Sequence, residues 1–291
     1  MYSGVINVFK ERGYTSNDVV QIIKKITRTK VGHTGTLDPS ATGVLPICLG
    51  RATKIADYIM ASDKEYIARV VLGIQTDTGD ADGNIMHQMP ACATKEDVLA
   101  ILPQFVGNIV QVPPMYSAIK VGGKKLYEYA RSGVEVERKK REIFIKNIEI
   151  LNFESPTSFV VRVDCSKGTY IRTLCEDIGL ALGTVAHMGS LIRTRSGNFV
   201  AKESVSLGQL KMHGVERFLI PPDAVLHNYP KISILADGDV LLANGNKIPI
   251  EHAPSAVGLA PGQEFLIYSS TGRLAGIFSA EAGLLRPKVM L

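Results

Sequence analysis

The chain has 291 residues, of which 45% are hydrophobic and 21% are charged, and it carries a net charge of +5. This length and composition suffice to bury one large core or two smaller ones, which excludes wholesale disorder. No apolar run approaches the roughly 20 residues of a membrane-spanning helix, and the first residues lack the basic and apolar regions of a signal peptide. We therefore expect a cytoplasmic protein with no membrane attachment.

The four cysteines give no sign of a disulfide framework or a metal site. Cys48, Cys92, Cys165 and Cys175 form no C-x-x-C pair and no ligand spacing with the six histidines. Zinc sites and disulfide-stapled domains both depend on such spacings. We expect buried free thiols and no metal.

The first 110 residues mix strand-like and helix-like segments. Residues 5–9 and 66–72 are predicted to be strands, the second because its apolar residues alternate. Thr15 with Asp18 and Thr94 with Asp97 form capping-box patterns, which mark helix starts. Apolar residues then recur at helical spacing, as Val19, Ile22, Ile23 and Ile26 in the first helix and as Val98, Ile101, Leu102 and Phe105 in the second.

The remainder of the chain continues this mixture and then changes texture. Residues 143–150 and 158–165 are predicted strands, and Ile171, Leu174, Cys175 and Ile178 indicate a helix that ends near Gly183. No regular βαβ cadence appears, which favours the α+β class over a doubly wound parallel sheet. From about residue 230, after Pro221-Pro222, short apolar runs are broken by turn dipeptides, which is typical of a β-domain of roughly 60 residues.

The positive charge is concentrated in one segment. Between Lys120 and Lys146 lie nine basic residues and four glutamates, so this segment alone carries an excess equal to the net charge of the chain. Such a run is either a solvated helix face or an electrostatic contact for a polyanion. Composition alone does not choose between them.

One loop carries an unusual density of polar residues around a single acid. Residues 32–46, GHTGTLDPSATGVLP, contain two features typical of a tight loop, which are flanking glycines and a proline directly after Asp38. Neither a P-loop nor G-x-G-x-x-G is present, G-x-S-x-G is absent, and His33 with Asp38 lacks further metal ligands nearby. What remains is either a turn-capping aspartate or a carboxylate that acts alone as a nucleophile on an electrophilic carbon.

The surrounding string decides between these alternatives. GHTGTLDPSATGVLPICLGRATK closely resembles the catalytic motif of the TruB family, the tRNA pseudouridine(55) synthases. Five further blocks resemble family motifs in the family's order, namely KERGYTSND, DKEYIARVVLG, TDTGDADG, QVPPMYSAIKVGGKKLYEYARSG and SKGTYIRTLCEDIG. The resemblance covers nearly the whole chain and weakens after about residue 225. Glu11 stands where the family usually has proline, which concerns the stiffness of the first loop.

The resemblance implies the reaction and its residues. Uridine in the T-loop of tRNA would be isomerised to pseudouridine, with neither metal nor organic cofactor. Asp38 matches the catalytic aspartate, which attacks either the base or the sugar carbon. Arg172 matches the arginine that pairs with it and Tyr66 the active-site tyrosine that packs on the target base. Taken alone, Tyr66 would be a core aromatic and Arg172 a surface residue.

Further residues would bind the RNA. Tyr170 and Leu191 match residues lining the uridine pocket, and Asp80 is a weaker match to a residue that contacts the displaced loop. His33 matches the residue that stacks in the space left when the base is extruded. The basic arm, about 116–146, would then grip the RNA backbone, through Lys124, Lys125, Arg138, Lys139 and Arg141.

The implied fold is α+β, with a pseudouridine-synthase catalytic domain (1–224) on a mixed, mostly antiparallel sheet and a small C-terminal β-rich PUA-like RNA-binding domain (225–291). The expected partner is the T-arm of tRNA, bound by a monomer without guide RNA. Two alternatives remain. One is a dyskerin-type synthase, which needs a guide RNA and protein partners. The other is a non-catalytic RNA-binding or chaperone protein on the same scaffold, against which the joint presence of Asp38, Tyr66 and Arg172 argues.

Overall fold

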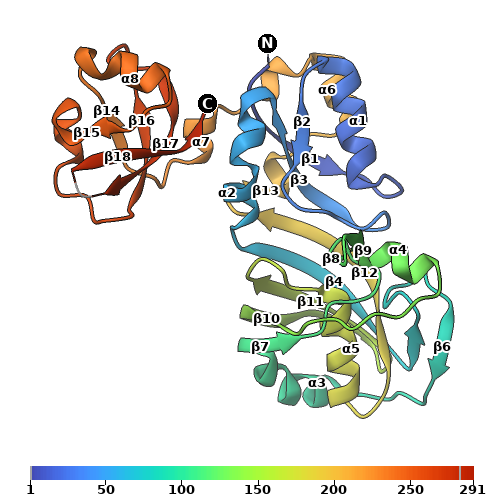
Figure 1. The fold of residues 1–291 in the computed structure, drawn as a ribbon. Coiled ribbons are helices and arrows are strands. Elements are labelled where there is room, and N and C mark those ends of the chain that lie inside the picture. Colours follow the sequence, from blue (N-terminus) through green and yellow to red (C-terminus); the bar gives the residue numbers. More distant parts are fainter. Residues whose placement is uncertain (1, 282) are drawn as a thin grey trace.

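The computed structural model describes residues 2–281 and 283–291, and nine of the described strands form one large sheet (Figure 1). The order along the sheet is β1 (Gly4–Lys10), β3 (Thr42–Leu49), β12 (Ala186–Ser196), β4 (Lys64–Leu72), β11 (Ser158–Cys165), β10 (Arg141–Ser155) and β7 (Gly107–Gln111). At its side, β2 (Val31–His33) pairs with β3 and β13 (Phe199–Val200) with β12. Among the described strand pairs of this sheet, only β12–β3 is parallel. The expected mixed, mostly antiparallel sheet is confirmed.

The two capping boxes start helices as predicted. In α1 (Ser16–Thr27) and α3 (Lys95–Ile101) the threonine accepts from the backbone of the aspartate, whose carboxylate accepts from the threonine N–H. Ile26 lies within α1 as predicted, although its side chain is 40% exposed and the buried face of the helix does not include it. The prediction is wrong for Leu102 and Phe105, which lie outside α3, in a 3-10 turn, because Pro103 cannot continue the helical hydrogen bonding.

The main core lies where helices pack on the sheet. α5 (Ile171–Ala181) buries the predicted Ile171, Leu174, Cys175 and Ile178, and this helix contacts β12. Alternate residues of β4 from Lys64 to Leu72 are buried, which places Tyr66 on the inner face. Shorter helices complete the body, namely α2 (Ala56–Met60), α6 (Leu207–His213) and α7 (Pro222–Val225).

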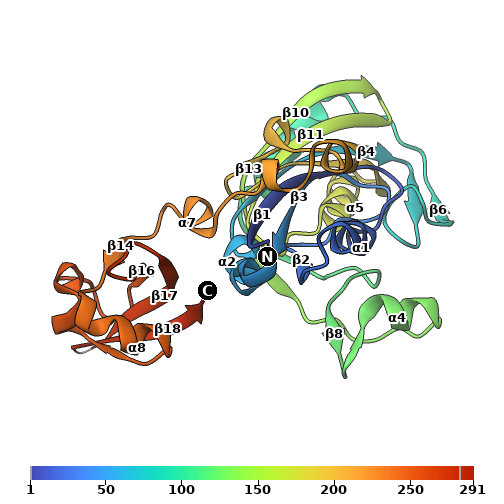
Figure 2. The same cartoon turned by 90° about the horizontal axis from the view of Figure 1, so that it is seen from above.

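Two insertions follow strands of this sheet, one after β4 and one between β7 and β10. One is the hairpin of β5 (Ile74–Thr76) and β6 (Ile85–Gln88), whose turn holds TDTGDADG. The other is the basic arm (residues 116–146), which contains β8 (Lys120–Val121), β9 (Lys124–Lys125), α4 (Leu126–Arg131) and the start of β10. Figure 2 shows β8 and α4 standing away from the body. Only six residues of the arm are helical, so a long solvated helix face does not account for its charge.

The C-terminal part has a sheet of its own, in the order β14 (Lys231–Ser233), β16 (Glu264–Tyr268), β17 (Leu274–Glu281), β18 (Leu284–Met290) and β15 (Ile248–Pro249), with α8 (Asp239–Ala243) beside it. This agrees with the predicted β-rich, PUA-like part. Its Leu266 and Ile277 share a buried apolar cluster with Val5, Val44 and Ile55 of the body. The C-terminal part is therefore in apolar contact with the body.

Two further observations concern the sequence expectations. Among the described residues, no helix is long and apolar enough to span a membrane. All four cysteines are free, and Cys48, Cys165 and Cys175 are buried as expected. Cys92 is exposed, so the expectation was wrong for it, because it lies in the irregular segment before α3 rather than in a strand or helix.

Candidate active site

Asp38 lies on the loop between β2 and β3, and this loop is tied to the start of α1. The N–H of Ala41 donates to the carbonyl of Asp38 at 3.1 Å, which closes a turn through Pro39. The Ser16 hydroxyl accepts from the N–H of Leu37 at 2.9 Å and lies 3.1 Å from its carbonyl. Residues on both sides of Asp38 are therefore fixed, and the carboxylate is presented in one place.

Lys10 holds the same loop through hydrogen bonds to backbone carbonyls. Its side chain is fully buried, and its Nζ donates to the carbonyls of Pro39 at 3.1 Å, Tyr14 at 2.7 Å and Glu11 at 3.1 Å. Burial lowers the pKa of Lys10 to about 8, although the nearby Asp38 carboxylate opposes this shift. The position that departs from the family, Glu11, thus contributes its backbone carbonyl to the support.

Arg172 joins three separate segments at the carboxylate. Its Nε is 3.3 Å from one oxygen of Asp38 and a terminal nitrogen is 3.5 Å from the other. The same guanidinium donates to the carbonyls of Thr78 at 3.0 Å and Tyr116 at 2.7 Å. Arg172 is only 6% exposed, so the alternative of a surface arginine is wrong. It lies at the start of α5, where the helix meets the sheet.

The electrostatics of Asp38 are a balance of burial and charge. Burial raises the pKa of the Asp38 carboxyl, Arg172 lowers it, and the Asp80 carboxylate raises it again. An oxygen of Asp80 lies 3.9 Å from Arg172. Asp80 is itself buried and accepts from the Thr78 hydroxyl and the N–H of Asp82. Arg172 therefore stabilises two carboxylates in one site, in a fixed planar geometry.

The residues expected to line the uridine pocket come from three elements. Tyr66 on β4 and Leu191 on β12 are both buried in the main core. Tyr170 precedes α5 and is held by Gln111, whose side-chain amide bonds to both its N–H and its carbonyl. Burial raises the pKa of both tyrosines, and the charges of Arg172 and Asp38 act on Tyr170. Tyr170 therefore lies close to the Asp38–Arg172 pair.

His33 ends β2, just before the Asp38 loop. Its Nδ1 accepts from the N–H of Gly35 at 3.3 Å. Burial lowers the pKa of His33, and the charges of Arg193 and Lys125 lower it further, so the imidazole is neutral at pH 7. Because the charge of Lys125 acts on the His33 ring, the basic arm lies near this end of the site.

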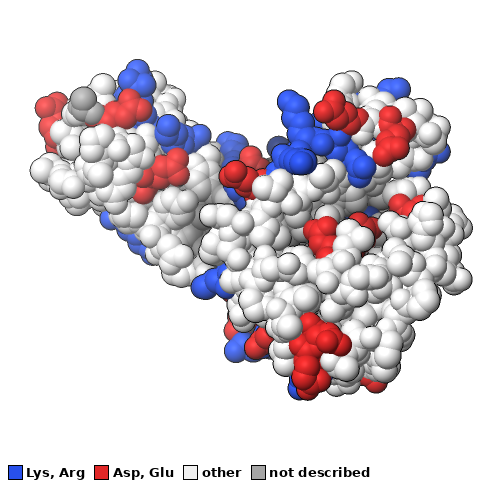
Figure 3. Space-filling view, turned by 90° about the horizontal axis from the view of Figure 1, so that it is seen from below, with Lys and Arg blue, Asp and Glu red and all other residues white. Residues whose placement is uncertain are grey.

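The basic residues of the arm differ in their freedom to meet RNA. Lys124, Lys139 and Arg141 are exposed, while Lys125 lies 5.4 Å from the centre of the Tyr127 ring. Arg138 is engaged within the protein, since it donates to the carbonyl of Pro113 at 3.2 Å and pairs with Glu135 at 3.4 Å. Figure 3 shows Lys and Arg side chains gathered on one side of the lobe that the arm forms, with acidic side chains beside them.

Comparison with known proteins adds the family. A model of the TruB family pseudouridylate synthase N-terminal domain matches residues 23–171, and one of the tRNA pseudouridylate synthase B C-terminal domain matches residues 172–226. The chain belongs to the TruB family. Among its relatives, the tRNA pseudouridine synthase B of Clostridium tetani is 50% identical over 84% of this chain and 86% of that protein. The tRNA pseudouridine synthase B of Bacillus pumilus is 43% identical, and the match covers 100% of this chain and 98% of that protein.

Solved structures extend the likeness of this TruB-family chain to the complete fold. A Cbf5-Nop10-Gar1 complex contains a chain that is 28% identical, with a TM-score of 0.74, covering 99% of this chain and 84% of that one. A chain of an archaeal box H/ACA Nop10-Cbf5 complex is 27% identical, with a TM-score of 0.73. The match includes the C-terminal sheet, which the family models do not reach.

Several residues of this TruB-family site escape inspection of the sequence. The missed residues are Lys10, Thr78, Tyr116 and Arg193. Thr78 and Tyr116 contribute only backbone carbonyls, which no side-chain pattern reveals. Lys10 is the first residue of KERGYTSND, and the resemblance of this block to a family motif was the available signal. Arg193 occurs in an alternating strand, and nothing in the sequence distinguishes it from a solvent-facing arginine.

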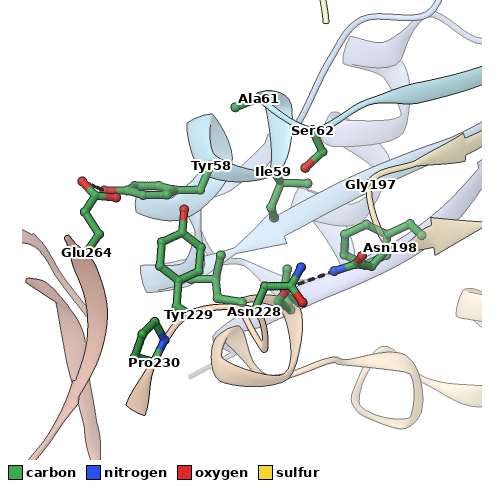
Figure 4. A pocket seen from close by; sticks show the side chains of 13 residues that line it. Tyr58, Ile59, Ala61, Ser62, Gly197, Asn198, Asn228, Tyr229, Pro230 and Glu264 are labelled. Atoms are coloured by element: carbon green, nitrogen blue, oxygen red, sulfur yellow. Dashed lines mark hydrogen bonds between the residues drawn. The ribbon is translucent and has the colours of Figure 1, made fainter. Parts of the chain in front are cut away.

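A cavity of about 500 Å³ lies away from this site, at the junction of the body and the C-terminal part. Figure 4 shows Tyr58 and Tyr229 on one side of it and Asn198 on another, with Glu264 near the Tyr58 hydroxyl. None of the Asp38 site residues lines this cavity. Among the described residues, no group of three or more His, Cys, Asp or Glu side chains is arranged to hold a metal ion.

Proposed function

We propose that this chain isomerises uridine to pseudouridine at position 55 in the T-loop of tRNA, as a monomer and without guide RNA. The observation that carries the proposal is the Asp38–Arg172 pair, a loop carboxylate held by a buried guanidinium at 3.3 and 3.5 Å. Its relatives over nearly the whole chain carry the name tRNA pseudouridine synthase B, which supports tRNA as the substrate.

Asp38 acts as the covalent catalyst. The bond between N1 of uracil and C1′ of ribose breaks, the base turns, and a bond between C5 and C1′ forms. The proton leaves C5 and N1 gains one, so the reaction is balanced without a cofactor. Asp38 attacks either the base or C1′, and both routes need an ionised carboxylate in fixed geometry, which Arg172 and Lys10 favour.

The uridine is received outside the RNA stack. Tyr66 packs on the target base, while Tyr170 and Leu191 line the pocket around it. The neutral ring of His33 fills the space that the base leaves, because a planar uncharged imidazole can stack between bases. Asp80 contributes through Arg172, and a contact of its carboxylate with RNA would require its loop to open, since it is buried.

The RNA backbone is held by the basic arm and the C-terminal part. The exposed Lys124, Lys139 and Arg141 contact phosphates, and Lys125 does so next to His33. Arg138 reaches phosphate only if it releases Pro113 and Glu135. We assign residues 1–224 to the catalytic domain and 225–291 to a PUA-like RNA-binding domain.

The guide-RNA alternative is supported only by the likeness to Cbf5 complexes, at 27 to 28% identity, against 43 to 50% for the tRNA pseudouridine synthase B relatives. The test is to incubate the purified chain with an unmodified tRNA transcript and map pseudouridine. Product at position 55 in the absence of any other RNA or protein is expected.

A transcript with cytidine at position 55 is the matched control and should yield nothing. Product that forms only after guide RNA and partner proteins are added would overturn the proposal in favour of the dyskerin-type reading. Tight binding of tRNA with no product under any condition would favour the non-catalytic reading. Light scattering of the active sample reports the oligomeric state, and a dimer would refute the monomer.

A further inference from the structure

Arg193 is a buried arginine on β12, at the edge of the candidate active site. It is 1% exposed and pairs across strands with Tyr66 of β4. Directly opposite residues of neighbouring strands share a face of the sheet, so the Arg193 side chain lies on the face that carries Tyr66. Arg195, two residues later, follows a bulge and pairs with Glu65, so it lies on the opposite face.

The guanidinium of Arg193 contacts both ends of the loop that carries Asp38. One terminal nitrogen donates to the carbonyl of Gly35 at 3.1 Å, and Nε donates to the carbonyl of Val44 at 2.7 Å. Gly35 precedes Asp38 by three residues and Val44 follows it by six. One planar group therefore joins the two chain segments that enter and leave the loop, which fixes their separation.

The backbone around the loop is shaped for this close approach. Gly43 has φ +112°, and a Cβ there would lie 2.2 Å from the carbonyl oxygen of Arg193. Gly35 has φ +134°, a conformation that favours glycine. Both positions belong to the string GHTGTLDPSATG, and Gly43 is the glycine that lets the backbone of β12 approach the loop.

The charge of Arg193 has no carboxylate partner in the described part of the chain. It is absent from every ion pair formed there, whereas Arg172 and Arg195 each pair with an aspartate. A buried cation without a counter-ion is costly to keep, which points to a role beyond stability. Burial lowers the pKa values of His33 and Lys10 and the charge of Arg193 lowers them further, while the same charge opposes the burial that raises the pKa of Tyr66.

We propose that Arg193 is a positioning residue, which clamps the two ends of the Asp38 loop and sets the geometry between Asp38, Tyr66 and His33. It acts through these residues and does not touch the substrate. The inference deepens the proposed function and rests on it for its kinetic readout. Two further readouts use the protein without RNA.

The experiment compares R193Q and R193K with R195Q, the matched control on the same strand and the opposite face. At saturating tRNA, the single-turnover rate of R193Q should fall on the order of 100-fold, because a shift of the carboxylate by about 1 Å costs that much. The Kd for tRNA should stay within about threefold, because phosphate contacts elsewhere dominate affinity. R193K keeps the charge and one hydrogen bond, so it should retain more activity than R193Q. R195Q should match the wild type.

The RNA-free readouts separate a clamp from general destabilisation. Amide hydrogen exchange in residues 34–41 should accelerate in R193Q and stay unchanged in R195Q. By NMR, the pKa of His33 should rise in R193Q and rise less in R193K, with Lys125 the other charge that acts on this ring.

Wild-type rate and wild-type loop exchange in folded R193Q would overturn the proposal. If R193Q does not fold, R193K decides, and a wild-type rate in R193K would overturn it equally. Should the wild-type chain form no pseudouridine at all, the proposed function fails while exchange and the His33 pKa still judge the clamp.

Discussion

Replacing Asp38 with asparagine should separate catalysis from stability. The amide is nearly isosteric but carries no charge, so it cannot act as the nucleophile. Loss of a covalent nucleophile costs on the order of 10⁴ to 10⁶ in turnover, and we expect no detectable pseudouridine in a single-turnover assay. Binding of tRNA should be unchanged, because RNA affinity comes mainly from phosphate contacts.

The effect of the same change on stability follows from the position of Asp38. Burial raises its pKa above the ordinary value, so the folded chain holds the Asp38 proton more tightly than the unfolded chain does. Stability from this group is therefore complete at low pH and decreases as pH rises through the folded pKa. At pH 7 the ionised carboxylate costs stability, by about 1.4 kcal/mol for each unit by which the folded pKa is raised.

Asp38→Asn removes that cost, while Arg172 keeps its bonds to the carbonyls of Thr78 and Tyr116. The variant should therefore unfold at the wild-type temperature or up to ~4 °C above it at pH 7. The difference should shrink towards zero as pH falls to about 4, the ordinary pKa of an aspartate. Calorimetry at pH 7 and at about pH 4 measures the unfolding temperature. Filter binding measures the affinity for tRNA, and pseudouridine mapping measures turnover.

Two results would refute this reasoning. Activity within tenfold of wild type, after mass spectrometry has excluded deamidation to aspartate, would remove Asp38 from the chemistry. A variant that unfolds several degrees below the wild type at pH 7 would mean that the Asp38–Arg172 pair stabilises the fold more than its burial costs.

Three other predictions follow from the contacts of the site and the arm. Alanine at the exposed arm residues Lys124, Lys139 and Arg141 should reduce the slope of log tRNA affinity against log salt concentration by roughly 0.7 to 0.9 per lost phosphate contact. An unchanged slope would mean that the arm is a solvated surface. Arg138→Ala, at an arginine already engaged by Pro113 and Glu135, should change the slope less. His33→Ala should slow the reaction more on folded tRNA than on a short single-stranded loop, and equal losses would assign His33 to the chemistry instead. Lys10→Met should destabilise the chain by about 2 to 4 kcal/mol in denaturant unfolding, because the carbonyls of Glu11, Tyr14 and Pro39 each lose a hydrogen bond to a charged donor, and a loss under 1 kcal/mol would contradict that support.

Elements that have local causes were predictable from the order of the amino acids. A capping box needs only residues three apart, and a strand that buries one face needs only alternation, so α1, α3 and β4 were predictable. The family and the reaction were also legible, because GHTGTLDPSATG and five other blocks are contiguous strings. The local pattern misled at Leu102, which lies outside α3, and the reason was equally local, because a proline follows it directly.

The contacts that hold the site together join distant parts of the chain, and no local pattern predicts them. Arg172 is 134 residues from Asp38, and Arg193 is 149 residues from Val44, so these contacts exist only because the sheet brings β3, β4 and β12 side by side and packs α5 against β12. Alternation could not tell a surface arginine from a buried one, since charge and spacing are the same in both. Which arginine is buried depends on what packs over it, and that is a property of the whole fold.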